Sequence, residues 1–419
     1  MKQAIVLKTR LYPSQQQGLL FSQVCEQYRK ACNYASRVYF KHNCNLSVTA
    51  FHCLTYRTIR AKYGLKSQLA VSVPRTIKAR YQSVDTQLRH KSYSFQNQNT
   101  KQWYHGYKNI GWLWNPIKFN RPQADLVANR DWSLTDNCNH LSVNTLKKRA
   151  VLDYYLPKYF KKYLGMTHKL GTAKLLNRQG HWYLHIACTV DTPDFDYHKQ
   201  TENTVGIDRG LRFLAYTYDN HRHSLSFNGL KIRRKRCHFL KHRAVLQAKG
   251  TKSAKRKLKS ISGRENRWMT NVNHRVSKAL VRHYGKRTTF VLEDLRGVRF
   301  STEQVSKKYR YSQVTWTFYQ LEQFLKYKAK LNQSIVIKIN PKYTSQRCPH
   351  CGRVLAQNRQ HHIHKYICEY CEYSSNDDRI GAMNIRWLGQ QKVQSIKKHF
   401  KPTINPNLII KDNGQLALF

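Results

Sequence analysis

Two Cys-x-x-Cys pairs near the end of the chain have the spacing of a metal site. The first pair is Cys348 and Cys351, and the second is Cys368 and Cys371. Two such pairs can bring four thiolates together tetrahedrally around one Zn²⁺ ion. We therefore predict one structural zinc ion held by these four cysteines. Alternative ligands are the neighbouring histidines His350, His361, His362 and His364.

Carboxylates at the ends of apolar runs are the second set of candidate functional residues. Asp208 follows a strand-like run that begins at Val205, and Glu293 and Asp294 end a β-prone run that begins at Thr288. An uncompensated carboxylate at the end of a buried strand is costly, so a metal ion or a basic partner is expected. A tight turn at the first acid and a solvated strand end at the second are the plainer alternatives.

A third acidic position lies at a predicted helix start. Asp377 and Asp378 precede a small-residue segment that begins at Ile380, and Asp is also a favoured helix N-cap without any chemical role. Three acids on separate elements could nevertheless bind two Mg²⁺ ions for phosphodiester cleavage. This interpretation requires the three acidic positions to lie close together in the folded chain.

The charge balance predicts a polyanionic partner. The chain has 75 Lys and Arg against 22 Asp and Glu, a formal net charge of +53. Lys and Arg that neutralise phosphates release condensed counterions, so we expect strong, salt-sensitive and largely sequence-independent nucleic-acid binding. A large folded RNA would use this charge better than a short DNA site, whereas a solvated basic surface is the alternative.

Several short motifs together resemble one family. They are, in chain order, Leu11-Tyr12-Pro13, Cys32-Asn33-Tyr34-Ala35, Gly206-Ile207-Asp208, Leu292-Glu293-Asp294-Leu295, Thr344-Ser345-Gln346, and Asp378 ahead of Ala382-Met383-Asn384-Ile385. With the four cysteines between the second and third acids, the chain resembles over most of its length the TnpB (OrfB) RNA-guided endonucleases of bacterial insertion sequences, relatives of the type V CRISPR nucleases.

This resemblance implies a catalytic set and its cofactors. Asp208, Glu293 and Asp378 match the Asp, Glu and Asp of a RuvC-like nuclease, which bind two Mg²⁺ ions. The choice of Glu293 over Asp294 rests on this match. Four thiolates leave no open position for water, so the zinc ion is expected to be structural.

One departure from the family pattern concerns the third acid. The family's motif usually has Asn two residues after its catalytic Asp, whereas Ile380 stands there in this chain. The alignment of Asp378 against Asp377 is therefore left open by the sequence.

The expected fold is α/β and multidomain. The resemblance implies a RuvC-like (ribonuclease H-like) nuclease core with an inserted zinc ribbon, an N-terminal helical recognition lobe and a wedge-type β-barrel. The expected divisions are 1–12 (first barrel strand), 13–91 (helical lobe), 92–192 (rest of the barrel), 193–203 (linker), 204–345 (first part of the nuclease), 346–373 (zinc ribbon), 374–400 (last part of the nuclease) and 401–419 (tail).

A strongly basic segment lies inside the expected nuclease. From Lys231 to Arg264 the chain has fourteen Lys and Arg and no acid. A helix with this composition lacks internal ion pairs, so phosphate is its expected partner, and a mobile basic linker is the alternative. Aromatic clusters at 103–108 and 112–116 could stack on bases, although barrel packing is the more usual role.

We expect an RNA-guided DNA endonuclease with a guide RNA and target double-stranded DNA as partners. A type V CRISPR effector, a cleavage-deficient RNA-guided repressor and a cut-and-paste transposase are the alternatives. No nucleoside triphosphate motif is evident, so no ATP dependence is expected. The scattered other cysteines and the lack of a secretory or membrane-spanning apolar run favour reduced thiols in a bacterial-type cytosol, with the protein on the nucleoid.

Overall fold

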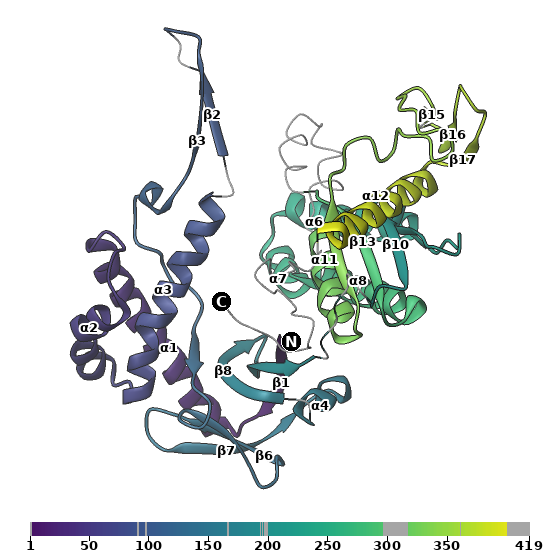
Figure 1. The fold of residues 1–419 in the computed structure, drawn as a ribbon. Helices are drawn as coiled ribbons and strands as arrows, with labels where there is room; N and C mark the ends of the chain where they lie inside the picture. The colour runs from purple at the N-terminus through teal and green to yellow at the C-terminus, as the bar shows by residue number, and fades with distance from the viewer. Residues whose placement is uncertain are drawn as a thin grey trace, which may run out of the picture. The chain divides into compact units, whose positions relative to one another are not determined.

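The computed structural model describes residues 2–89, 92–96, 99–165, 167–192, 194, 196, 200–295, 317–360 and 362–399. The predicted tail 401–419 and the alternative ligand His361 lie outside these residues. By its contacts the chain divides into two compact units, residues 2–191 and the residues from 192 onward. Figure 1 shows the elements of each unit.

Three helices follow the first strand of the N-terminal unit. They are α1 (Gln15–Lys41), α2 (Val48–Tyr63) and α3 (Ser67–Arg89). Ser14 caps α1 in a capping box with Gln17, which satisfies backbone N–H groups at the helix start. Gly64, at φ 62°, ends α2 in the left-handed conformation that glycine adopts without strain.

A seven-stranded sheet forms the rest of this unit's framework. Its order is β4-β8-β9-β1-β7-β6-β5, and every pairing is antiparallel. The strands are β1 (Lys2–Tyr12), β4 (Gln123–Leu126), β5 (Trp132–Thr135), β6 (His140–Asn144), β7 (Arg149–Tyr155), β8 (Thr167–Arg178) and β9 (His181–Asp191). The first strand of the chain thus lies in the middle of a sheet whose other strands come after the helices.

Smaller elements connect the helices to the sheet. An antiparallel pair, β2 (Ser92–Gln96) and β3 (Trp103–Tyr107), is followed by a 3₁₀ turn η1 (Ile110–Trp112), and a short helix α4 (Lys158–Gly165) precedes β8. Trp114 is 88% exposed, so it is not a packed core residue of this unit. That exposure differs from the packed role expected for most aromatics of this region.

A five-stranded sheet organises the second unit. Its order is β12-β11-β10-β13-β14, with β10 (Asn203–Asp208), β13 (Thr288–Glu293) and β14 (Ile335–Ile339) parallel and β11 (Phe213–Tyr218) and β12 (Ser226–Asn228) antiparallel. Both predicted acidic strands are therefore present, and they are neighbours. Parallel neighbours end at the same edge of a sheet, so their terminal residues lie close together.

Helices cover the two faces of this sheet. On one face, α8 (Arg264–Tyr284) and α11 (Thr317–Leu331) share a core with alternate strand residues, including Val205, Ile207, Phe290 and Leu292. The predicted apolar positions Leu321, Leu325 and Ala329 of α11 are buried in this core.

On the other face lies α12 (Asp377–His399), the yellow helix that crosses β10 and β13 in Figure 1. A Cβ atom at Gly206 of β10 would collide with the main chain of Ala382 and Arg386, and one at Gly389 would collide with Val291. Glycine at these positions therefore lets helix and sheet approach at backbone distance.

Two further features complete the unit. The basic segment forms α6 (Leu230–Lys249) and α7 (Lys252–Ile261), so it is helical and not an unstructured linker. The cysteine-rich segment contains a small antiparallel sheet of β15 (Arg359–Gln360), β16 (Lys365–Ile367) and β17 (Ser374–Asn376), and β17 leads directly into α12. Across the described part of the chain, no helix is both long and apolar enough to span a membrane.

Candidate active site and zinc centre

Asp208 and Glu293 lie side by side at the carboxyl edge of the second sheet. Ile207 of β10 pairs with Leu292 of β13, and each acid is the next residue of its strand. Side chains alternate between the faces of a strand. Because Ile207 and Leu292 enter the core under α8 and α11, both acids face the α12 side.

The start of α12 closes over Asp208. A Cβ atom at Gly381, the fifth residue of this helix, would lie 2.8 Å from Asp208 Oδ2. Similarly, a Cβ atom at Gly210 would lie 3.8 Å from Asp378 Oδ1. The helix start and the strand end therefore meet without side chains between them, which brings the first and third acids together.

Asp378 does not serve as the cap of its helix. Asn376 Oδ1 accepts hydrogen bonds from the backbone N–H groups of Asp378 and Arg379, at 3.1 and 3.3 Å. Asp378 Oδ2 is buried and has no hydrogen-bond partner among the described residues. The nearest cation is Arg212, whose Nη1 is 3.8 Å away. The simpler role of helix cap thus falls to Asn376, and the carboxylate of Asp378 remains available.

Asp377, the other acid of this pair, is occupied by protein partners. Its side chain is 1% exposed and receives Arg359 Nε at 3.2 Å, with His364 Nδ1 3.6 Å away. Both partners come from the cysteine-rich segment. Asp377 therefore attaches that segment to the start of α12.

Glu293 and Asp294 also differ in their side-chain partners. Thr344 Oγ1 lies 2.5 Å from Glu293 Oε1 and 2.8 Å from the main-chain oxygen of Pro341, so its single proton is shared between two acceptors. Asp294 instead has Lys338 Nζ 3.5 Å from its Oδ1. Of the two acids, Glu293 is the one that stands beside Asp208.

All three carboxylates have a raised pKa, chiefly because they are buried. Burial, and then the charges of Glu293 and Asp378, raise the pKa of Asp208 to about 7. Burial also raises the pKa of Glu293 and that of Asp378, where the charge of Asp377 adds to the effect. The charge of Arg359 offsets part of this rise in the pKa of each acid, so the cysteine-rich segment places a positive charge near the group.

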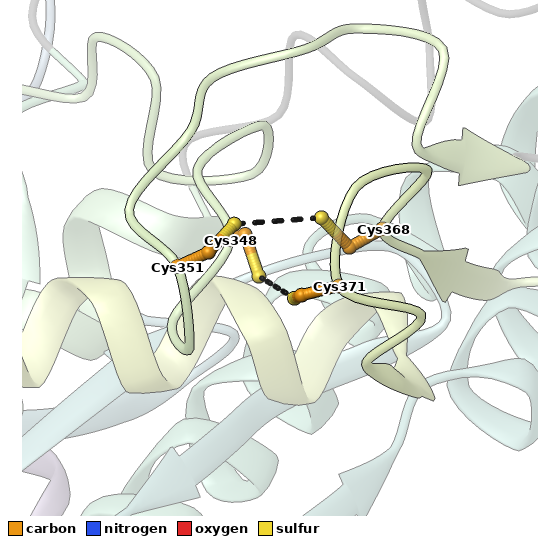
Figure 2. A group of neighbouring side chains, drawn as sticks. All are labelled: Cys348, Cys351, Cys368 and Cys371. Atoms are coloured by element: carbon orange, nitrogen blue, oxygen red, sulfur yellow. Dashed lines mark hydrogen bonds between the residues drawn. The ribbon is translucent and has the colours of Figure 1, made fainter.

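The four cysteines converge as the sequence predicted. Figure 2 shows Cys348 opposite Cys371 and Cys351 opposite Cys368, with a sulfur separation of 3.6 Å in each pair. Their sulfur atoms all lie within 4.8 Å of one another. A tetrahedral Zn–S₄ site with bonds of about 2.3 Å separates its sulfurs by about 3.8 Å, whereas a disulfide requires about 2.05 Å. The geometry fits a zinc ion.

Two of the histidines considered as alternative ligands, His350 and His364, take other positions. His364 lies against Asp377 and shares a potential metal-binding cluster with Asp377 and Asp378, not with the thiols. The ring of His350 stacks on Tyr373 with centroids 6.0 Å apart. Since the thiols alone form the cysteine-centred cluster of the described residues, the histidine alternative is wrong for these two side chains.

The basic helix α6 contacts a buried acid that the sequence did not predict. Glu265 of α8 accepts Arg236 Nε at 3.1 Å and Arg243 Nη1 at 2.6 Å. This buried acid lies one residue beyond the acid-free segment and joins α6 to α8. Phosphate therefore cannot be the expected partner of every cation in the segment.

Comparison with known proteins places the chain in a family. Residues 185–297 match a family model described as "Probable transposase" (OrfB), and residues 318–385 match the Cas12f1-like TNB domain. A TnpB-like protein of Methanocaldococcus jannaschii is 31% identical over 195 residues, which cover 45% of this chain and 69% of that protein. The chain belongs to the TnpB-like family.

More distant similarity extends to a CRISPR nuclease. The CRISPR-associated endodeoxyribonuclease Cas12f1 of Sulfoacidibacillus thermotolerans is 28% identical over 244 residues, 53% of this TnpB-like chain and 54% of that enzyme. The chain thus matches about half of that relative's length. A solved Cas12f1–sgRNA–target DNA complex shares the fold, with a TM-score of 0.55 and 12% identity over 92% of this chain and 98% of that one.

Two contacts of this site were not predicted from the TnpB-like sequence. Thr344 was noticed only as part of a motif, and its contact with Glu293 gives it a structural role. Arg359 belongs to none of the sequence motifs. A lone arginine in a histidine-rich loop carries no sequence signal, because its target, Asp377, becomes a neighbour only when β15 and β17 join the same small sheet.

Proposed function

We propose that this chain is an RNA-guided DNA endonuclease in which Asp208, Glu293 and Asp378 form the catalytic centre. The convergence of these three carboxylates on one face of the sheet, next to an inserted four-cysteine site, supports this function. The family membership and the names of the relatives, a TnpB-like protein and an endodeoxyribonuclease, support it further.

The residues fit divalent metal ions of the Mg²⁺ type. Such ions prefer carboxylate oxygens, and Asp378 Oδ2 is a buried oxygen without a hydrogen-bond partner among the described residues, near two further buried acids. We assign Asp208, Glu293 and Asp378 as ligands of two ions. When bound, the ions would activate water and stabilise the leaving oxygen of a phosphodiester.

The surrounding residues hold this centre in place. Thr344 orients Glu293, Arg359 offsets part of the negative charge, and the packing of Gly381 against Asp208 excludes side chains from the space between the first and third acids. The four thiolates would bind zinc as a structural ion, because the set leaves no open position. In this scheme the zinc ribbon supports the catalytic centre and does not cut.

The domain assignment follows the same scheme. Residues 204–345 and 374–400 would form a RuvC-like core, with residues 346–373 as its zinc ribbon. The helices of 13–91 would form a recognition lobe, and 1–12 with 92–192 a wedge-type element. The partners would be a guide RNA, which selects the target by base pairing, and double-stranded DNA with a short adjacent motif read by the protein.

A CRISPR-associated effector is the second candidate, since Cas12f1 matches half of the chain. It would use the same catalytic residues. A CRISPR repeat array beside the gene would favour the effector, and insertion-sequence ends would favour a transposon-encoded nuclease.

The direct test is guided cleavage by the full chain with its copurified RNA. Sequencing that RNA should give one long species that ends in a variable guide, and a plasmid with the matching target should be cut. Asp208→Ala should abolish cleavage while binding of guide and target remains near normal. A matched control is Asp153→Ala, at a surface acid that is 77% exposed in the other unit. Absence of bound RNA, or loss of binding in Asp208→Ala, would contradict the proposal.

A further inference from the structure

Arg209, the residue after Asp208, has its own connection to Glu293. Its side chain is 2% exposed, and its Nη2 donates to the main-chain oxygen of Glu293 at 2.7 Å. The β10–β13 ladder ends at the Ile207–Leu292 pair. The guanidinium therefore adds a hydrogen bond between the two strands one step beyond the last backbone pairing.

The other guanidinium contacts lead to a buried acid on α11. Arg209 Nη1 lies 3.2 Å from the main-chain oxygen of Phe318 and 3.4 Å from Glu322 Oε2. The side chain of Glu322 is 5% exposed and also receives Lys326 and Lys338, each at 2.8 Å. One buried carboxylate thus holds three cations under the strand ends.

This charge network joins the residues that follow both strand acids. Lys338 of β14 reaches Asp294 as well as Glu322, and Glu322 reaches Arg209. Asp208 and Glu293 face α12, while Arg209 and Asp294, one residue further along, face the network on the α11 side. The residue after Asp208, Arg209, contacts Glu322 directly, and the residue after Glu293, Asp294, is connected to Glu322 through Lys338.

Stability alone gives little reason for such an arrangement. Removing a guanidinium and a carboxylate from water costs several kcal/mol per ion, and well-packed apolar residues often replace a buried ion pair without loss of stability. Burial lowers the pKa of Arg209, which reflects that cost. Apolar residues could not, however, replace the directed hydrogen bond from Arg209 to the Glu293 carbonyl.

We propose that Arg209 and Glu322 are positioning residues that fix the separation of the Asp208 and Glu293 carboxylates. Arg209 holds the backbone of Glu293, and Glu322 holds the guanidinium in the orientation that this contact needs. This inference rests on the proposed nuclease function. A catalytic metal site tolerates displacements of only about 0.5 Å, so loss of the contact should weaken metal binding and slow cleavage.

The first test is Arg209→Lys in the full chain with its guide RNA. Lysine keeps the charge but cannot donate to both the Glu293 carbonyl and Glu322 in the fork geometry of arginine. Single-turnover cleavage should slow by about 10- to 100-fold, and half-maximal cleavage should need several-fold more Mg²⁺. Guide and target binding should not change. Lys326→Gln is the matched control, because Lys326 contacts the same Glu322 but not Glu293; its rate should stay within about twofold of the unmutated chain.

A double variant separates positioning from folding. Arg209→Met with Glu322→Met removes both buried charges together, so the melting temperature should stay close to that of the unmutated chain. Cleavage should still slow and the Mg²⁺ requirement should still rise. Cleavage and Mg²⁺ dependence unchanged in either the folded double variant or Arg209→Lys would overturn the inference. The proposed function itself fails if the unmutated chain carries no RNA or does not cut, or if Asp208→Ala cuts equally well or loses binding. None of these results depends on Arg209 or Glu322, so the two failures are distinguishable.

Discussion

Asp208 and Glu293 stand one residue beyond the paired Ile207 and Leu292 on adjacent parallel strands, on the face that α12 covers. Two acids at neighbouring strand ends would repel each other as bare carboxylates in a buried setting, and this repulsion contributes to the raised pKa of Asp208. Asp208 and Glu293 are therefore an electrostatically unfavourable pair, and their charge should make the stability of the fold depend on pH.

The first prediction concerns stability and pH. An unfolded Asp titrates near pH 3.9, whereas the pKa of Asp208 in the fold is about 7. The folded state therefore keeps its proton while the unfolded state loses it, so this group destabilises the fold progressively from about pH 4 to pH 7 and fully above that range. In Mg²⁺-free buffer, Asp208→Asn should raise the melting temperature by several degrees at pH 8 and by less at pH 5. The exposed acid Asp153, changed to Asn, should give no such pH-dependent gain; an equal gain for Asp208→Asn at both pH values would contradict the assignment.

The second prediction separates the two acids at the start of α12. Asp377→Asn loses the charge that pairs with Arg359, so the free energy of unfolding should fall by about 1–3 kcal/mol. Asp378→Asn should change stability little, because its Oδ2 accepts no hydrogen bond from the described residues and its nearest cation, Arg212, is 3.8 Å away, but cleavage should fall by at least about 1,000-fold. Denaturant melts and single-turnover cleavage measure the two effects. A reversed pattern would assign the catalytic role to Asp377.

The third prediction concerns zinc. The purified chain should contain one zinc ion per molecule, and Cys368→Ser should lose it, since Cys368 is fully buried among the four thiols. Loss of zinc should also slow cleavage strongly, because Thr344 and Arg359 reach the acids from the segments around the metal. Elemental analysis and a cleavage assay test both parts. Cys237→Ser, at an exposed single cysteine, should retain zinc and activity.

The fourth prediction concerns the close approach of α12. In Gly381→Ala the new methyl group would lie 2.8 Å from Asp208 Oδ2, so cleavage should drop by about 10- to 100-fold with little change in target binding. Gly18→Ala is the control, because its methyl group would lie 3.5 Å from Trp182 Nε1 in ordinary contact, and it should be neutral or slightly stabilising. Unchanged cleavage in Gly381→Ala would argue against a catalytic role for the contact.

The fifth prediction distinguishes cations of α6 that look alike in sequence. Arg236 is bonded to the buried Glu265, so Arg236→Ala should mainly lower stability. Arg234 lines a surface pocket with Arg233 and Lys241, so Arg234→Ala should leave stability unchanged and weaken nucleic-acid binding. If Arg234 contacts phosphate, the slope of log affinity against log salt should fall by about 1. Binding titrations at several salt concentrations provide the measurement, and an unchanged slope would count against a phosphate contact there.

Local sequence patterns were sufficient for the elements of the site. Alternating and apolar runs predicted the strands that end at Asp208 and Glu293, and the apolar spacing predicted the helix that contains Leu321 and Leu325. Cys-x-x-Cys spacing predicted the four-thiol cluster. These features depend on neighbours within one strand, one helix or one turn, so the local sequence is enough to predict them.

Only the tertiary structure shows which protein partners each acid of a pair has. Strand alternation puts Glu293 beside Asp208 and Asp294 beside Lys338, while Arg359 occupies Asp377 and leaves Asp378 available. It also decided that Arg209, one residue after an acid, holds the backbone of the next. The sequence specified residue types and local periodicity. The partners come from elements far apart in the chain, and only packing of the sheet, α11, α12 and the cysteine-rich segment brings them within hydrogen-bond distance.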